Sequence, residues 1–153
     1  MHRQISRCLY LIVCFVFFLW VDLYFSTQLV RQLNEGLVIS TKVFALTYVK
    51  NYGAAFSILQ DSRELLIILS VVAITLLFGY VIKHLKTISL KSIFFISLLS
   101  AGIAGNLHER IAYGFVRDFF EIKAFNFPVF NISDIFITVG VFTLIVLILA
   151  KRA

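Results

Sequence analysis

The chain has 153 residues, a length typical of one domain, and 61% of these residues are hydrophobic. Only 14% are charged, against about 25% in an ordinary soluble domain, and the mean hydropathy is +0.98. A soluble domain of this size could not bury so much apolar surface, so we expect a protein of the lipid bilayer. The formal net charge of +6 does not indicate a nucleic-acid-binding protein, because the basic residues flank apolar segments and form no nucleic-acid-binding motif. We therefore expect membrane lipids, and no nucleic acid, among its partners.

Four apolar segments have roughly the length that a helix needs to cross the hydrocarbon, which is about 20 residues. They cover residues 8–25, 65–82, 92–107 and 135–150. The first segment continues through Trp20 and Tyr24 without a small-residue cleavage site, so we expect an uncleaved span and not a signal peptide. The sequence predicts an all-α membrane protein with four transmembrane helices in a single integral-membrane domain, residues 1–153.

The Lys and Arg residues predict the orientation of these segments, because short cytoplasmic loops are rich in them. The segments 26–64 and 108–134 hold equal numbers of basic and acidic residues. The opposite side holds seven basic residues and no acidic ones: Arg3, Arg7, Lys83, Lys86, Lys91, Lys151 and Arg152. We therefore expect both termini in the cytoplasm and the two long segments outside.

The first outer segment combines a polar part with a part that predicts a strand. Residues 28–36 are polar and typical of a linker, whereas residues 37–50 are rich in β-branched and aromatic side chains. Asn51 and Gly53 predict a turn, which is either their whole role or part of a site. Because an open strand edge is not stable in hydrocarbon, we expect a small sheet at the outer membrane surface. In the third span, the small residues between 100 and 105 predict close helix packing.

The unusual polar residues gather at the outer ends of the spans. They are Asp22, Asn51, Asn106, Arg110, Asp118, Asn131 and Asp134. Ionisable residues at membrane depth are functional candidates by default. Two carboxylates in a partly dry site do not both ionise easily, so Asp118 and Asp134 could share a proton. One would then act as general base on a water while the other polarises a carbonyl, which is hydrolysis with no metal and no cofactor.

Structural interpretations of the same residues stay open. Asn131 could cap the fourth helix, with Asp134 as a favourable charge in its first turn. Asp118 could be a solvated loop charge, since Arg117 precedes it. Asp22 could reach the interface or pair with a neighbouring helix.

Four motifs in chain order resemble those of one family. They are NYGAAFS (51–57), GNLHER (105–110), GFVRDF (114–119) and FPVFNISD (127–134). In a four-span chain they resemble the lipoprotein signal peptidases, or type II signal peptidases, of bacteria, from about Asp22 to Gly140. The resemblance implies an aspartyl endopeptidase of the bacterial cytoplasmic (inner) membrane. Its substrates would be prolipoproteins whose cysteine already carries diacylglycerol, and it would cut just before that cysteine to release the signal peptide.

The resemblance also implies a fold and a role for individual residues. The fold has four helices and a small outer sheet that cradles the substrate, with the active site at the outer face. The implied catalytic residues are Asp118 and Asp134, the substrate-binding residues are Asn51, Gly53, Asn106, Arg110 and Asn131, and the structural residues near the site are Asp22 and Glu109.

The chain departs from the family pattern at four positions. The family usually has Asp where this chain has Glu109, and an apolar residue where it has His108. It often has Lys where this chain has Ser26, and Ala where it has Ser133. None of these changes touches the two aspartates, so they bear on positioning and substrate preference.

Two other functions compete with this hypothesis. A non-catalytic membrane binding protein or pseudoenzyme for lipoprotein precursors is compatible with the departures. A small transporter or channel subunit would need polar residues along its spans, but the polar residues gather at one face, so we rank it last.

Overall fold

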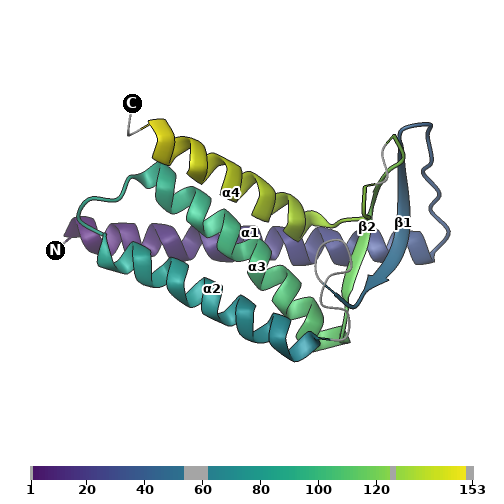
Figure 1. The fold of residues 1–153 in the computed structure, drawn as a ribbon, viewed down its shortest axis with the longest axis horizontal. Coiled ribbons are helices and arrows are strands. Elements are labelled where there is room, and N and C mark those ends of the chain that lie inside the picture. The colour runs from purple at the N-terminus through teal and green to yellow at the C-terminus, as the bar shows by residue number, and fades with distance from the viewer. Residues whose placement is uncertain (1, 54–61, 125–126, 151–153) are drawn as a thin grey trace.

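The computed structural model describes residues 2–53, 62–124 and 127–150, and within them it contains four helices and a two-stranded sheet (Figure 1). In chain order the elements are α1 (His2–Asn34), β1 (Phe44–Asn51), α2 (Arg63–Lys83), α3 (Leu90–Tyr113), β2 (Val116–Ile122) and α4 (Ile132–Ala150). All four helices are long and apolar enough to cross a membrane, which confirms the predicted fold class. The sheet lies at one end of the bundle, while the start of α1 and the end of α4 lie at the other (Figure 1).

Helix α3 is the centre of the bundle and packs against each of the other three helices. In its most apolar window 56% of the residues are buried, against 11% in the corresponding window of each other helix. A Cβ atom on Gly102 would lie 2.5 Å from the Ser133 carbonyl oxygen, and one on Gly140 would lie 2.8 Å from the Leu99 Cβ. Side chains at these positions would collide, so α3 and α4 pack backbone to backbone, as the small residues of the third span predicted.

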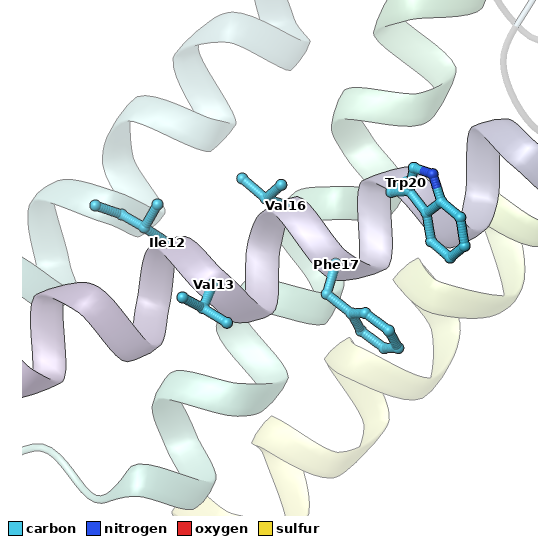
Figure 2. Close-up of a pocket in the computed structure, with 5 residues that line it drawn as sticks. All are labelled: Ile12, Val13, Val16, Phe17 and Trp20. Carbon is cyan, nitrogen blue, oxygen red and sulfur yellow. The ribbon is translucent and has the colours of Figure 1, made fainter.

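The outward faces of the other helices are apolar and exposed. Figure 2 shows one of them, an open groove on α1 lined by Ile12, Val13, Val16, Phe17 and Trp20. Each of these side chains is more than half exposed. Such a continuous apolar surface is costly in water but not in hydrocarbon. This face is therefore suited to contact with lipid.

The helices extend beyond the predicted spans, most of all α1. The linker predicted at residues 28–36 is wrong, because the helix continues to Asn34 before the left-handed Gly36 (φ 98°) ends it. The N–H groups of Gly36 and Leu37 donate to the carbonyl oxygens of Leu33 and Gln32, as in a Schellman motif. Polarity alone suggested a linker, but a helix that leaves the membrane can also be polar on its exposed faces.

The sheet joins two segments that are far apart in the sequence. β1 and β2 pair antiparallel, with Asn51 opposite Val116 and Val49 opposite Asp118. The strand predicted at residues 37–50 begins only at Phe44, and β2 was not predicted at all. The first four residues of β2 are all buried, so its sequence lacks the polar–apolar alternation that reveals a strand. Residues 54–57 of the NYGAAFS motif lie outside the described residues.

A second segment returns along the other edge of β2. The Phe130 N–H donates to the Phe120 carbonyl oxygen at 3.0 Å, and the Phe120 N–H donates back at 2.8 Å. Asn131 follows Phe130 directly and is therefore placed beside β2. This pairing folds the chain between Asp118 and Asp134 back on itself.

Candidate active site

The predicted catalytic and substrate-binding residues meet where the sheet joins the ends of α3 and α4. Asn51 ends β1 and Gly53 lies just beyond it. Asn106 and Arg110 come from α3 and Asp118 from β2, while Asn131 directly precedes α4 and Asp134 lies in its first turn. Asp118 is only 2% exposed, so the interpretation of this residue as a solvated loop charge is wrong.

Asn131 and Asp134 form a reciprocal cap at the start of α4. The Asp134 N–H donates to Asn131 Oδ1 at 2.9 Å, and the Asn131 N–H donates to Asp134 Oδ2 at 3.2 Å. This arrangement is a capping box, in which each side chain satisfies a backbone N–H of the other residue. The capping interpretation is confirmed, but it occupies only one polar atom of each side chain. Asn131 Nδ2 and Asp134 Oδ1 stay available for the site.

The cap determines how two asparagine amides are oriented. Because Asn131 Oδ1 faces a backbone N–H, the opposite atom of this amide must be Nδ2. Nδ2 donates to Asp118 Oδ1 at 2.8 Å and to Asn106 Oδ1 at 3.0 Å. Asn106 must then present its own Nδ2, which donates to Asp134 Oδ1 at 2.9 Å. A chain of two amides therefore links the two carboxyl groups.

Asn51 holds the second oxygen of Asp118 in the same way. The Gly53 N–H donates to Asn51 Oδ1 at 2.9 Å, which is the turn that the sequence predicted. The amide orientation is thereby fixed, and Asn51 Nδ2 donates to Asp118 Oδ2 at 2.9 Å. The turn and the contact with Asp118 are two roles of one side chain.

Arg110 is buried and ties the end of β1 to α3. Its Nη2 donates to the Gly53 carbonyl oxygen at 2.8 Å, and its Nη1 donates to the Asn106 carbonyl oxygen at 3.1 Å. The guanidinium group thus fixes the backbone on both sides of the polar cluster. It also places a permanent positive charge near the two aspartates.

Burial raises the pKa of Asp118 from its ordinary value of 3.8 to about 7. The Asn51 amide opposes this rise, as do the Asn131 amide and the Arg110 charge, while the charge of Asp134 adds to it. A carboxyl group with this pKa is present in both protonation states near neutral pH. Such a group can both accept and release a proton during a reaction.

Glu109 does not face the aspartates but forms a buried ion pair with Arg117. Arg117 Nε and Nη2 donate to the two Glu109 oxygens at 2.6 and 2.5 Å. The Arg117 guanidinium also lies 4.3 Å from the centre of the Tyr113 ring. Gly114, with φ 84°, ends α3 in the left-handed conformation and lets the chain carry Arg117 back to Glu109. The pair holds β2 against α3.

Sequence reasoning overlooked this role of Arg117. The available signal was the longer reach of Glu109 compared with the usual Asp, together with an arginine just beyond a helix-ending glycine. His108, the neighbouring departure, is exposed, and its ring centre lies 6.3 Å from that of Tyr113.

Asp22 lies against Gly105 of α3 and pairs with a neighbouring helix, which was one of the two interpretations of this residue. Its Oδ2 accepts a hydrogen bond from Ser133 Oγ of α4, and its Oδ1 accepts one from Ser26 Oγ at 3.2 Å. In residues 2–53, 62–124 and 127–150 there is no cluster of three or more His, Cys, Asp and Glu residues that could hold a metal ion.

Comparisons with known proteins agree on one family. The family model described as signal peptidase (SPase) II matches residues 11–150. A lipoprotein signal peptidase of Streptococcus pneumoniae is 35% identical over 134 residues, which are 86% of this chain and 87% of the relative. Another, of Caldicellulosiruptor bescii, is 44% identical over 109 residues, 71% of this chain and 69% of the relative. A solved bacterial membrane enzyme superposes with a TM-score of 0.81 at 27% identity. The match covers 94% of this chain and 89% of the enzyme's chain.

Proposed function

This chain belongs to the signal peptidase II family of aspartic-type membrane proteases, and from that premise we propose that it removes the signal peptide from diacylglyceryl-modified prolipoproteins through Asp118 and Asp134. The observation that carries the proposal is the amide chain of Asn131 and Asn106, which joins the buried Asp118 carboxyl group to the half-buried Asp134 carboxyl group. A helix cap alone does not require a second aspartate at the other end of such a chain.

The orientation of the amides defines where a shared proton lies. Asn51, Asn106 and Asn131 can only donate through Nδ2, so each amide occupies a lone pair of a carboxylate oxygen. A proton on Asp118 or Asp134 must therefore sit on a lone pair that no amide faces. These remaining lone pairs are the ones available to a water molecule and to the substrate carbonyl.

The reaction follows from one proton held by the pair. The ionised carboxylate takes a proton from a water molecule as the water oxygen attacks the carbonyl carbon of the scissile peptide bond. The other carboxyl group gives its proton to the carbonyl oxygen, which forms a gem-diol. When the diol collapses, the C–N bond breaks, the first carboxyl group gives its proton to the leaving nitrogen and the second takes a proton from a diol hydroxyl, so the pair returns to its starting state.

The substrate-binding residues act chiefly by fixing this geometry. Asn51, Asn106 and Asn131 hold the carboxyl groups, and Arg110 holds the backbone at Gly53. A lipidated cysteine keeps the scissile bond near the membrane surface, where the acyl chains anchor it. Binding energy from those chains then brings the bond to the carboxyl groups in a reactive orientation.

We further propose that both termini are cytoplasmic and that the carboxyl groups face the outer side of a bacterial cytoplasmic membrane. The start of α1 and the α2–α3 connection share the end of the bundle that is remote from the sheet (Figure 1). Basic residues without acidic ones mark this end, which favours its cytoplasmic placement. Lys151 and Arg152, which belong to the same set, lie outside the described residues. Membrane lipid would then cover apolar faces such as the α1 groove in Figure 2.

The test is cleavage of a diacylglyceryl-modified precursor by the purified protein in lipid nanodiscs. Asp118→Asn and Asp134→Asn should each abolish cleavage, because an amide can neither take nor supply the transferred proton. Glu121→Gln makes the same carboxyl-to-amide change elsewhere on β2 and should leave the rate unchanged. Normal cleavage by either aspartate variant would disprove the dyad, and binding of the precursor without any cleavage by the unchanged chain would favour the pseudoenzyme hypothesis.

A further inference from the structure

We propose that Ser26 and Ser133 are positioning residues whose two hydroxyl groups together hold the Asp22 carboxylate, and that Ser133 thereby fixes the first turn of α4 for Asp134. The inference rests on the proposed function, because it concerns the placement of a proposed catalytic carboxyl group. It adds two serines at positions where the family often has lysine and alanine.

The three side chains form a closed polar cluster between α1 and α4. Asp22 and Ser133 are each 2% exposed, and Ser26 is 5% exposed. Ser133 Oγ donates to Asp22 Oδ2, and Ser26 Oγ donates to Asp22 Oδ1 at 3.2 Å. Within the described part of the chain no basic side chain makes an ion pair with Asp22. A buried carboxylate needs donors, so both hydroxyl groups are required at once.

Helix α3 leaves a space in which this cluster fits. A Cβ atom placed on Gly105 would collide with Asp22 Oδ2 and with Ser133 Oγ. Only glycine therefore lets α1, α3 and α4 meet at this point. The cluster is a built contact among three helices and not an incidental surface interaction.

Ser133 transmits the contact to the proposed catalytic residue because it directly precedes Asp134. The first turn of α4 is held to α1 by the bond from Ser133, and its cap residue Asn131 is held to β2 and α3 by the bonds from Nδ2 to Asp118 and Asn106. Attachments to three different elements oppose rotation of the helix about its axis. The Asp134 carboxyl group is thus kept where Asn106 can donate to it at 2.9 Å.

The two serines are also two of the departures from the family pattern, and they contact the same carboxylate. Position 26 lies one helical turn beyond Asp22, so a lysine there could place its ammonium group on the carboxylate. In this chain two neutral hydroxyl groups supply the donors instead, one from α1 and one from α4. The residues at positions 26 and 133 therefore depend on each other.

A single and a double variant test this dependence with the nanodisc cleavage assay. Ser133→Ala should lower kcat roughly 10- to 100-fold, the effect of a small misplacement of a catalytic group, and should leave KM within about twofold. The double variant Ser26→Lys/Ser133→Ala should recover most of the lost kcat, because the lysine replaces the missing donor. A wild-type kcat for Ser133→Ala, or a double variant as slow as the single one, would overturn the inference.

Ser97→Ala is the matched control. The Ser97 hydroxyl is also buried and contacts two helices, since it donates to the Ile93 carbonyl oxygen of α3 at 2.8 Å and to the Leu11 carbonyl oxygen of α1 at 3.2 Å, but it lies in the first half of α3, away from Asp134. Its loss should leave kcat unchanged, which separates positioning of Asp134 from general loosening of the bundle. A fall in kcat equal to that of Ser133→Ala would contradict the positioning role.

Two further variants keep the outcome interpretable. If Ser133→Ala does not accumulate in the membrane, Ser26→Ala replaces it in the assay. It should lower kcat only several-fold, because it removes the longer of the two hydrogen bonds to Asp22. An unchanged rate would refute the inference. Asp134→Asn separates the two proposals. If it is inactive while Ser133→Ala is normal, only the positioning role fails, whereas cleavage by Asp134→Asn refutes the proposed dyad itself.

Discussion

The Glu109–Arg117 ion pair allows a stability prediction with a defined magnitude. The two side chains are 6% and 9% exposed, and the contacts of 2.5 and 2.6 Å are bidentate. In Arg117→Met the Glu109 carboxylate keeps its burial but loses its partner, which costs about 3–5 kcal/mol. For a chain of this length that corresponds to a fall in unfolding temperature of roughly 6–20 °C. The measurement is thermal unfolding of the purified protein in detergent, followed by circular dichroism.

The same reasoning predicts that restoring the family residue is harmful in this chain. Glu109→Asp shortens the side chain by one methylene group, so its two oxygens no longer reach Arg117 together. We expect a loss of roughly 1–3 kcal/mol, the cost of a broken charged hydrogen bond in a buried site. The double variant Glu109→Leu/Arg117→Met should be more stable than Arg117→Met alone, because no unpaired charge stays buried.

The exposed pair Arg31–Glu35 provides the control. It has the same charges at 2.8 Å, but its side chains are 70% and 59% exposed. Arg31→Met should therefore change the free energy of unfolding by only about 0.3–0.5 kcal/mol. The reasoning is refuted if Arg117→Met unfolds at the same temperature as the unchanged chain, or if the two Arg→Met variants lose equal stability.

Three further predictions concern the site and its supports. Asn131→Ala should lower the free energy of unfolding by about 1–2 kcal/mol and also abolish efficient cleavage. Ser89 caps α3 by accepting a hydrogen bond from the Ser92 N–H, so Ser89→Ala should lower stability but not cleavage. Equal losses of activity in the two variants would contradict this. Gly105→Ala should prevent correct packing of α1, α3 and α4. A Cβ on Gly79 meets nothing within 4 Å, so Gly79→Ala should be neutral or stabilise the fold by about 0.5–1 kcal/mol. A lower unfolding temperature for Gly79→Ala than for Gly105→Ala would contradict the close contact at Gly105. Because the folded-state pKa of Asp118 is raised to about 7, the folded protein binds this proton more tightly than the unfolded chain does. The stability that this proton contributes is thus complete below pH 3.8 and is lost as pH rises through about 7. Unfolding temperatures measured from pH 4 to pH 8 should therefore fall less in Asp118→Asn than in the unchanged chain.

The sequence by itself determined the membrane class and the placement of polar groups. Hydrophobic run length is a local property, so the four spans could be read from composition alone. Helix capping is local too, and the spacing of Asn131 and Asp134 was enough to offer a cap as one interpretation. The motifs then identified which polar residues belong together, because they match one family in order.

The tertiary structure decided how those residues meet. β2 was missed because its first four residues are buried irrespective of type, so it shows no local alternation. The return of the chain depends on hydrogen bonds between Phe120 and Phe130, and the backbone N–H groups of Gly53 and Asp134 fix the amide orientations. The turn at Gly53 and the cap at Asp134 are local, but the contacts of the oriented amides with Asp118 and Asp134 join distant segments and have no local signature.

The same distinction applies to the buried charges. Glu109 and Ser133 looked like isolated departures from a pattern, yet each has a partner on another element, Arg117 in β2 and Asp22 in α1. A single sequence gives the side chains and their local preferences. Contacts between distant segments decide which charges are paired and which carboxyl groups lie together. Those contacts arise only when the helices and the sheet pack.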